Sequence, residues 1–207
     1  MVEADDQRQR LIRDAFRLEW LTVGWMAIEA AVAVASGIAA RSITVIAFGL
    51  DSVIELASAG ILIWRLSSEL RFGCEVSEPA ERIARRVAGG LLFALATYVV
   101  AAAGWSLWSG EGAAFSWPGL AVAILAIPIM LVLARRKRAL ADRLSSRALR
   151  ADAAEAIACL WLSLVVVVGL IAQFFAGLWW IDAVTSLAIV FFLIREGREA
   201  WGTDEDD

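Results

Sequence analysis

Acidic side chains recur at helical spacing inside two apolar stretches of this sequence. Asp51 and Glu55 stand four residues apart, and Asp152, Glu155 and Cys159 follow at steps of three and four. Residues three, four or seven apart share one face of an α-helix. Carboxylates and a thiol on two facing helices would form an anionic site, and such a site favours a divalent cation over an anion or a neutral solute.

Two further acids, Glu29 and Asp182, lie in other apolar stretches. An ionised side chain at the centre of a bilayer costs about 3 kcal/mol on insertion scales, so each such residue needs a partner or a role. We expect no Lys, Arg or His in the core of these stretches, so bound cations or protons should offset the charges. Glu19, Asp152 and Asp182 lie near helix ends. For these three acids, snorkelling or helix capping is as good an explanation as a functional role.

The composition indicates that these acids lie in membrane helices. The chain has 207 residues, 60% of them hydrophobic, and a mean hydropathy of +0.70. A soluble domain has about 45–50% apolar residues, and a membrane helix needs about 20. We therefore predict an all-α membrane protein with a cytoplasmic segment at residues 1–17, a six-helix domain at 18–195 and an acidic cytoplasmic tail at 196–207. The expected spans are residues 18–40, 43–64, 87–108, 117–134, 151–176 and 179–195.

The basic residues predict the orientation. If both termini lie on one side, all of the 19 Lys and Arg except Arg41 fall on that side. Basic residues favour the cytoplasm, so both termini are expected inside, in a bacterial inner membrane. The basic run at residues 135–138 is interpreted as a lipid-facing cluster that fixes topology, not as a nucleic-acid site. The polar connectors at residues 67–86 and 135–150 can continue the neighbouring helices.

Several classes of function are excluded by residues that the sequence lacks. It contains no His, which removes zinc fingers, HExxH sites and Ser-His triads, and we expect no enzyme. Its two cysteines, Cys74 and Cys159, are too far apart to suggest a disulfide framework, and nothing assigns Cys74 a function. No removed signal peptide is expected, because the N-terminus lacks a short apolar core followed by a cleavage site.

Residues 42–55, which end with Asp51 and Glu55, resemble the second helix of cation diffusion facilitator transporters. Residues 148–159, with Glu155 and Cys159, resemble the fifth helix of that family, and Asp182 falls where those proteins often begin helix 6. The resemblance implies a homodimer, formed through membrane helices, that exports divalent metal, most often zinc, in exchange for protons.

The resemblance also implies a transport site made of Asp51, Glu55, Glu155 and Cys159. Glu155 stands where zinc exporters of this family usually have His, and Cys159 stands where they usually have Asp. The family's cytoplasmic C-terminal domain is expected to be missing, because about a dozen residues follow the last span. Regulation by that domain is therefore not implied.

Three carboxylates and a thiol favour Zn²⁺ as the transported ion, with Cd²⁺, Mn²⁺, Fe²⁺ and Co²⁺ as alternatives. Glu29, Asp152 and Asp182 are candidates for an access route or a proton pathway. Two other functions remain open at this point. An acidic lumen would also suit a passive cation channel, and a non-transporting subunit could pair its acids with arginines of a partner protein.

Overall fold

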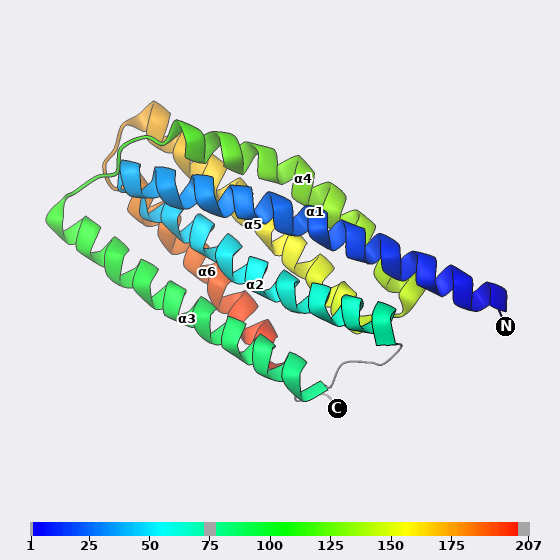
Figure 1. The fold of residues 1–207 in the computed structure, drawn as a ribbon. Coiled ribbons are helices and arrows are strands. Elements are labelled where there is room, and N and C mark those ends of the chain that lie inside the picture. Colours follow the sequence, from blue (N-terminus) through cyan, green and yellow to red (C-terminus); the bar gives the residue numbers. More distant parts are fainter. Residues whose placement is uncertain (1, 73–77, 203–207) are drawn as a thin grey trace.

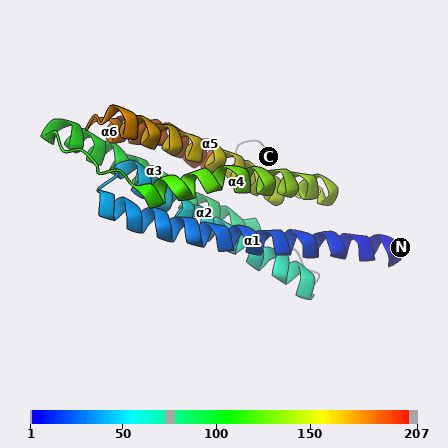
Figure 2. The same ribbon diagram turned by 90° about the horizontal axis from the view of Figure 1, so that it is seen from above.

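The computed structural model describes residues 2–72 and 78–202, and these residues form six helices and no strand. The expected all-α bundle is confirmed (Figure 1). The helices are α1 (Val2–Ala40), α2 (Ile43–Phe72), α3 (Glu78–Ser109), α4 (Trp117–Leu144), α5 (Arg147–Ala176) and α6 (Ile181–Gly202). Figures 1 and 2 show the helices running alternately up and down, with the start of α1 and the end of α6 at the same end of the bundle.

Most helices are longer than the predicted apolar spans. α1 begins at Val2, α2 continues to Phe72 and α4 to Leu144, so much of the polar connectors is helical, as the sequence allowed. Ile12 and Ala15, at the polar end of α1, pack against Ala141 of α4 and Leu149 of α5 in a small second core. Cys74 lies outside the described residues.

Serine residues determine where α4 and α5 begin. Ser116 accepts a hydrogen bond from the backbone N–H of Gly119 at 3.1 Å, and Pro118 occupies the first turn, where a missing N–H does no harm. Ser145 ends α4 in the left-handed region at φ 50°, and Ser146 accepts from Leu149 N at 3.3 Å. The short turn between α4 and α5 is therefore built from local hydrogen bonds.

The helices pack closely around α2. This helix contacts α1, α3, α5 and α6, while α4 packs along α5 and α3 along α6. A Cβ atom on Gly49 of α2 would lie 2.8 Å from the backbone nitrogen of Val34, closer than real Cβ contacts. On α5, a Cβ atom on Gly169 would overlap the side chain of Thr185. Glycine therefore permits α2 to approach α1, and α5 to approach α6.

The outer surface of the bundle is apolar. Among the described helices, α1 to α5 are long and apolar enough to cross a membrane. α6 does not meet this measure, because every long stretch of it includes Arg195, Glu196 and other charged residues. Large side chains such as Trp108 (83% exposed) and Phe175 (81% exposed) face outward. Such a surface suits lipid rather than water, and the protein is a multi-pass integral membrane protein.

Candidate metal site

Three carboxylates from two helices meet inside the bundle: Asp51 and Glu55 of α2 and Glu196 of α6. We call them the carboxylate cluster; one oxygen of each lies within 4.8 Å of the others. Asp51 is 0% exposed and Glu55 is 5% exposed. Neither oxygen of Asp51 or Glu55, nor Oε1 of Glu196, has a hydrogen-bond partner among the described residues. A buried acceptor left without a partner costs about 1–3 kcal/mol, so a bound cation would relieve a real penalty here.

Glu155 and Cys159, the predicted ligands on α5, lie beside the carboxylate cluster. α5 packs against α2, and Coulombic interactions connect Glu155 with Asp51 and Glu55. The thiol of Cys159 is fully buried and donates a weak hydrogen bond to Glu29 Oε1 at 3.7 Å. The bundle therefore brings α2 and α5 together, as a shared cation site requires. The ligand roles of Glu155 and Cys159 stay predictions.

Glu29 of α1, an expected access or proton-pathway residue, is buried among hydrogen-bond donors. Trp25 Nε1 donates to Oε2 at 2.7 Å, and Ser52 Oγ donates to Oε1 at 2.6 Å. Its charge interacts with that of Asp51. With the Cys159 thiol as a third donor, Glu29 links α1, α2 and α5 next to the carboxylate cluster. The oxygens of Glu29 are thus satisfied by protein groups, whereas those of Asp51 are not.

Lys137 of α4 is buried, with a side chain that is 1% exposed. Its Nζ lies 3.1 Å from Glu19 Oε2 and 2.5 Å from Asp152 Oδ2. The placement of Lys137 in a lipid-facing cluster is therefore wrong, and Asp152 has a basic partner that the sequence analysis did not expect. The cause is helix phase: its three arginine neighbours at residues 135–138 are exposed, but α4 continues past the apolar stretch and turns Lys137 inward.

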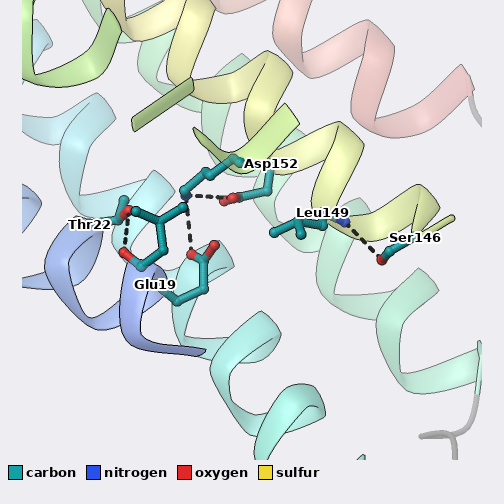
Figure 3. Close-up of polar contacts among 7 residues, drawn as sticks. Glu19, Thr22, Ser146, Leu149 and Asp152 are labelled. Atoms are coloured by element: carbon teal, nitrogen blue, oxygen red, sulfur yellow. Dashed lines mark hydrogen bonds and ion pairs between the residues drawn. The ribbon is translucent and has the colours of Figure 1, made fainter. Parts of the chain in front are cut away.

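The two ion pairs of Lys137 join three helices. Figure 3 shows Glu19 of α1 and Asp152 of α5 turned toward the same amine, which belongs to α4. A buried ion pair is tolerated only when the charges meet in good geometry. Asp152 therefore has a cationic partner, which distinguishes it from the residues of the carboxylate cluster.

Asp182, in the first turn of α6, caps the start of α2. Its Oδ1 accepts from Ser42 Oγ at 2.6 Å, and its Oδ2 accepts from the backbone N–H of Ile43 at 2.8 Å. Thr44 Oγ1 donates to the Asp182 carbonyl at 2.8 Å. A carboxylate at a helix N-terminus satisfies free N–H groups and interacts favourably with the helix dipole. The structure therefore shows Asp182 as a helix-capping residue, the explanation that was expected as an alternative to a functional role.

Asp182→Ala is expected to lower the thermal stability of the purified protein. The change removes the acceptor for Ser42 and Ile43, which corresponds to about 1–2 kcal/mol for the loss of a buried cap. Thermal unfolding in detergent measures the effect. Asp142→Ala is the matched control, because Asp142 forms an exposed ion pair with Arg150, of a kind that contributes little. Equal unfolding temperatures for the two variants would contradict the capping role.

Comparison with known protein families matches residues 20–201 to the cation efflux transmembrane domain. The chain belongs to the cation efflux family. Members of this family are transporters of divalent metal cations rather than enzymes, so this cation efflux protein is a cation transporter. No individual curated protein matches the chain. The match begins within α1, includes all of α2 to α5 and ends one residue before the end of α6, and it agrees with the resemblance found at residues 42–55 and 148–159.

Glu196 of this cation efflux protein is the cluster residue that sequence reasoning missed. The charged residues around it predict an acidic tail from residue 196, but α6 continues to Gly202. A helical signal existed: Asp182, Ile189 and Glu196 stand seven residues apart, which places them on one face of α6. Asp182 and Ile189 are buried on that face, so Glu196 follows them into the bundle.

Proposed function

We propose that this protein exports divalent metal cations from the cytoplasm in exchange for protons, with zinc as the preferred cargo. The proposed transport site contains Asp51, Glu55, Glu155 and Cys159. Cation transport itself follows from the family; the metal, the exchange and the residues are the proposal.

The observation that carries this proposal is that Asp51 and Glu55 are buried without a partner among the described residues. All four of their oxygens are buried and have no hydrogen-bond partner among the described residues. Lys137, the buried amine of α4, is engaged by Glu19 and Asp152 instead. Carboxylates kept away from water in this way need a positive charge from outside the protein, and carboxylate oxygen is a good ligand for Zn²⁺.

Exchange with protons follows from ligand chemistry. A carboxyl group or thiol must be deprotonated to bind a metal, so metal binding displaces the protons that these groups carry. Alternating exposure of one site to the two sides of the membrane then gives antiport. Among the three acids expected on the access or proton route, Glu29 is the best placed, since its charge interacts with that of Asp51. Asp152 and Asp182 already have structural partners.

The proposed orientation has both termini in the cytoplasm, with residues 1–17 and 196–207 on that side of a bacterial inner membrane. The support is the distribution of Lys and Arg, of which only Arg41 falls at the opposite end. We also propose a homodimer through the membrane helices, on the basis of family membership. The mass of the protein in nanodiscs, determined by native mass spectrometry, measures its oligomeric state.

Transport by the full chain in proteoliposomes tests the proposal. With a pH-sensitive dye in the lumen, Zn²⁺ added outside is expected to enter while the lumen becomes more alkaline, because protons leave as metal enters. Parallel assays with Cd²⁺, Mn²⁺, Fe²⁺ and Co²⁺ rank the cargoes. Empty liposomes provide the background leak.

Two other results would reject the exchange mechanism. Metal entry that follows an imposed membrane potential without any pH change would indicate a passive channel. A protein that gives no heat on titration with any of the five metals, and that purifies with a partner, would be a non-transporting subunit.

A further inference from the structure

We propose that Glu196 of α6 is a ligand for the transported cation, so that the site spans α2 and α6 and is not limited to α2 and α5. This inference rests on the proposed function, because it concerns the same cargo.

The directions of α2 and α6 explain how Glu196 reaches Asp51 and Glu55. The two helices run the same way and pack against each other. At about 1.5 Å per residue, Glu55 lies about 18 Å from the start of α2, and Glu196 about 22 Å from the start of α6. The difference in depth is about one turn of helix, which a Glu side chain can span, and one oxygen of Glu196 does lie within 4.8 Å of oxygens of Asp51 and Glu55.

The oxygens of the three side chains form a compact set. One oxygen from each of Asp51, Glu55 and Glu196 lies within 4.8 Å of the other two. Zn²⁺ binds carboxylate oxygen at about 2.0–2.2 Å, so an ion between these oxygens can reach all three after small side-chain adjustments. The four oxygens of Asp51 and Glu55, together with Oε1 of Glu196, are buried and lack a hydrogen-bond partner among the described residues.

Two basic residues of the described part of the bundle, Arg195 and Lys137, pair with other acids. Arg195, adjacent to Glu196 in sequence, is exposed, and its Nε lies 2.8 Å from Glu199 Oε1. Lys137 pairs with Glu19 and Asp152 on the α1, α4 and α5 side of the bundle. The charge of Glu196 interacts most with those of two acids, Asp51 and Glu155, and less with those of Glu199 and Arg195. Among the described residues, Glu196 therefore has no ion pair, and its Oε1 is buried without a hydrogen-bond partner.

The ligand set of the carboxylate cluster consists of oxygen atoms. Three carboxylates suit Zn²⁺, Mn²⁺, Fe²⁺ and Co²⁺, and they offer no soft ligand that would favour Cd²⁺. The sulfur of Cys159 is 3.7 Å from Glu29 Oε1, with which it forms a hydrogen bond. If Glu196 is a ligand, the site should bind Mn²⁺ as well as Zn²⁺. A movement of α6 would then also change the geometry of the site.

The test uses isothermal titration of the full chain in detergent with Zn²⁺ and, separately, Mn²⁺. Glu196→Gln is expected to weaken both metals by at least about tenfold, because it removes an anionic ligand and preserves the shape of the side chain. Asp142→Asn is the control: it neutralises an exposed acid of α4, and wild-type affinity is expected. Circular dichroism and size exclusion verify that both variants keep the fold.

Comparison with Asp51→Asn separates this inference from the proposed function. If Asp51→Asn loses metal binding while Glu196→Gln binds as the wild type does, Glu196 is not a ligand and the proposed function stands. If the wild-type protein binds neither metal, the proposed function fails and this inference fails with it. A loss in Asp142→Asn equal to that in Glu196→Gln would show an effect of net charge and would also reject the ligand role.

Discussion

Asp51→Asn is expected to reduce metal affinity more than about 100-fold and to abolish metal transport in proteoliposomes. Changes in groups that merely support a ligand cost about 10–100-fold in affinity, and Asp51 is proposed to touch the ion. It is 0% exposed, and both of its oxygens lack a hydrogen-bond partner among the described residues. Isothermal titration with Zn²⁺ and flux measured with a metal-sensitive dye determine the two effects.

A matched variant distinguishes loss of the site from loss of the fold. Asp142→Asn makes the same chemical change on the exposed face of α4, where Asp142 pairs with Arg150, and it should leave binding and flux unchanged. Asp51→Asn should not reduce the unfolding temperature, because the amide keeps the size of the carboxylate and carries no charge that burial would penalise. Zinc flux at the wild-type rate in Asp51→Asn would refute the assigned site.

The sequence predicted the six helices and the inward face of α2 for physical reasons that act locally. Apolar stretches of membrane length are separated by charged segments, and the backbone of such a stretch must form a helix to satisfy its hydrogen bonds. Asp51 and Glu55 could be assigned to one inward face because their spacing is helical and exposure of both to lipid would be costly. These conclusions required no knowledge of how the helices pack.

Charge density is a poor guide to where a span ends in this chain. Lys137 and Glu196 both lie among charged residues, and hydropathy alone assigns such residues to connectors or tails. Helix phase contains the missing information. Lys137 follows the buried residues Met130 and Ala134 at steps of four and three, so a continuous α4 must bring it inside. Its exposed neighbours give the same segment its basic character.

Contacts between distant residues could not be derived from spacing. The hydrogen bonds from Ser52 and Cys159 to Glu29 join three helices, and they depend on how these helices rotate against each other. The Asp182 cap on Ile43 likewise depends on the approach of α6 to the turn between α1 and α2. A sequence can show that a polar side chain needs a partner, but packing decides which partner it meets.

Lys137→Met is expected to destabilise the protein by about 3–5 kcal/mol, the usual effect of removing one member of a buried ion pair. Methionine fills much of the space of the lysine stem, but it leaves Glu19 and Asp152 facing each other without a cation. For a chain of this size the change corresponds to a fall of about 10 °C in unfolding temperature. Thermal unfolding in detergent measures the shift, and Arg138→Met, at an exposed position of the same helix, should leave it unchanged.

Neutralising both acids tests whether charge is the cause. Lys137→Met combined with Glu19→Gln and Asp152→Asn removes the uncompensated carboxylates and should recover most of the lost stability, since an apolar or neutral group can replace a buried ion pair at little cost. Recovery would show that Lys137 is retained in α4 to balance two acids rather than to fill volume. If the triple variant stays as unstable as Lys137→Met alone, packing of the lysine stem is the dominant contribution, and the electrostatic explanation is wrong.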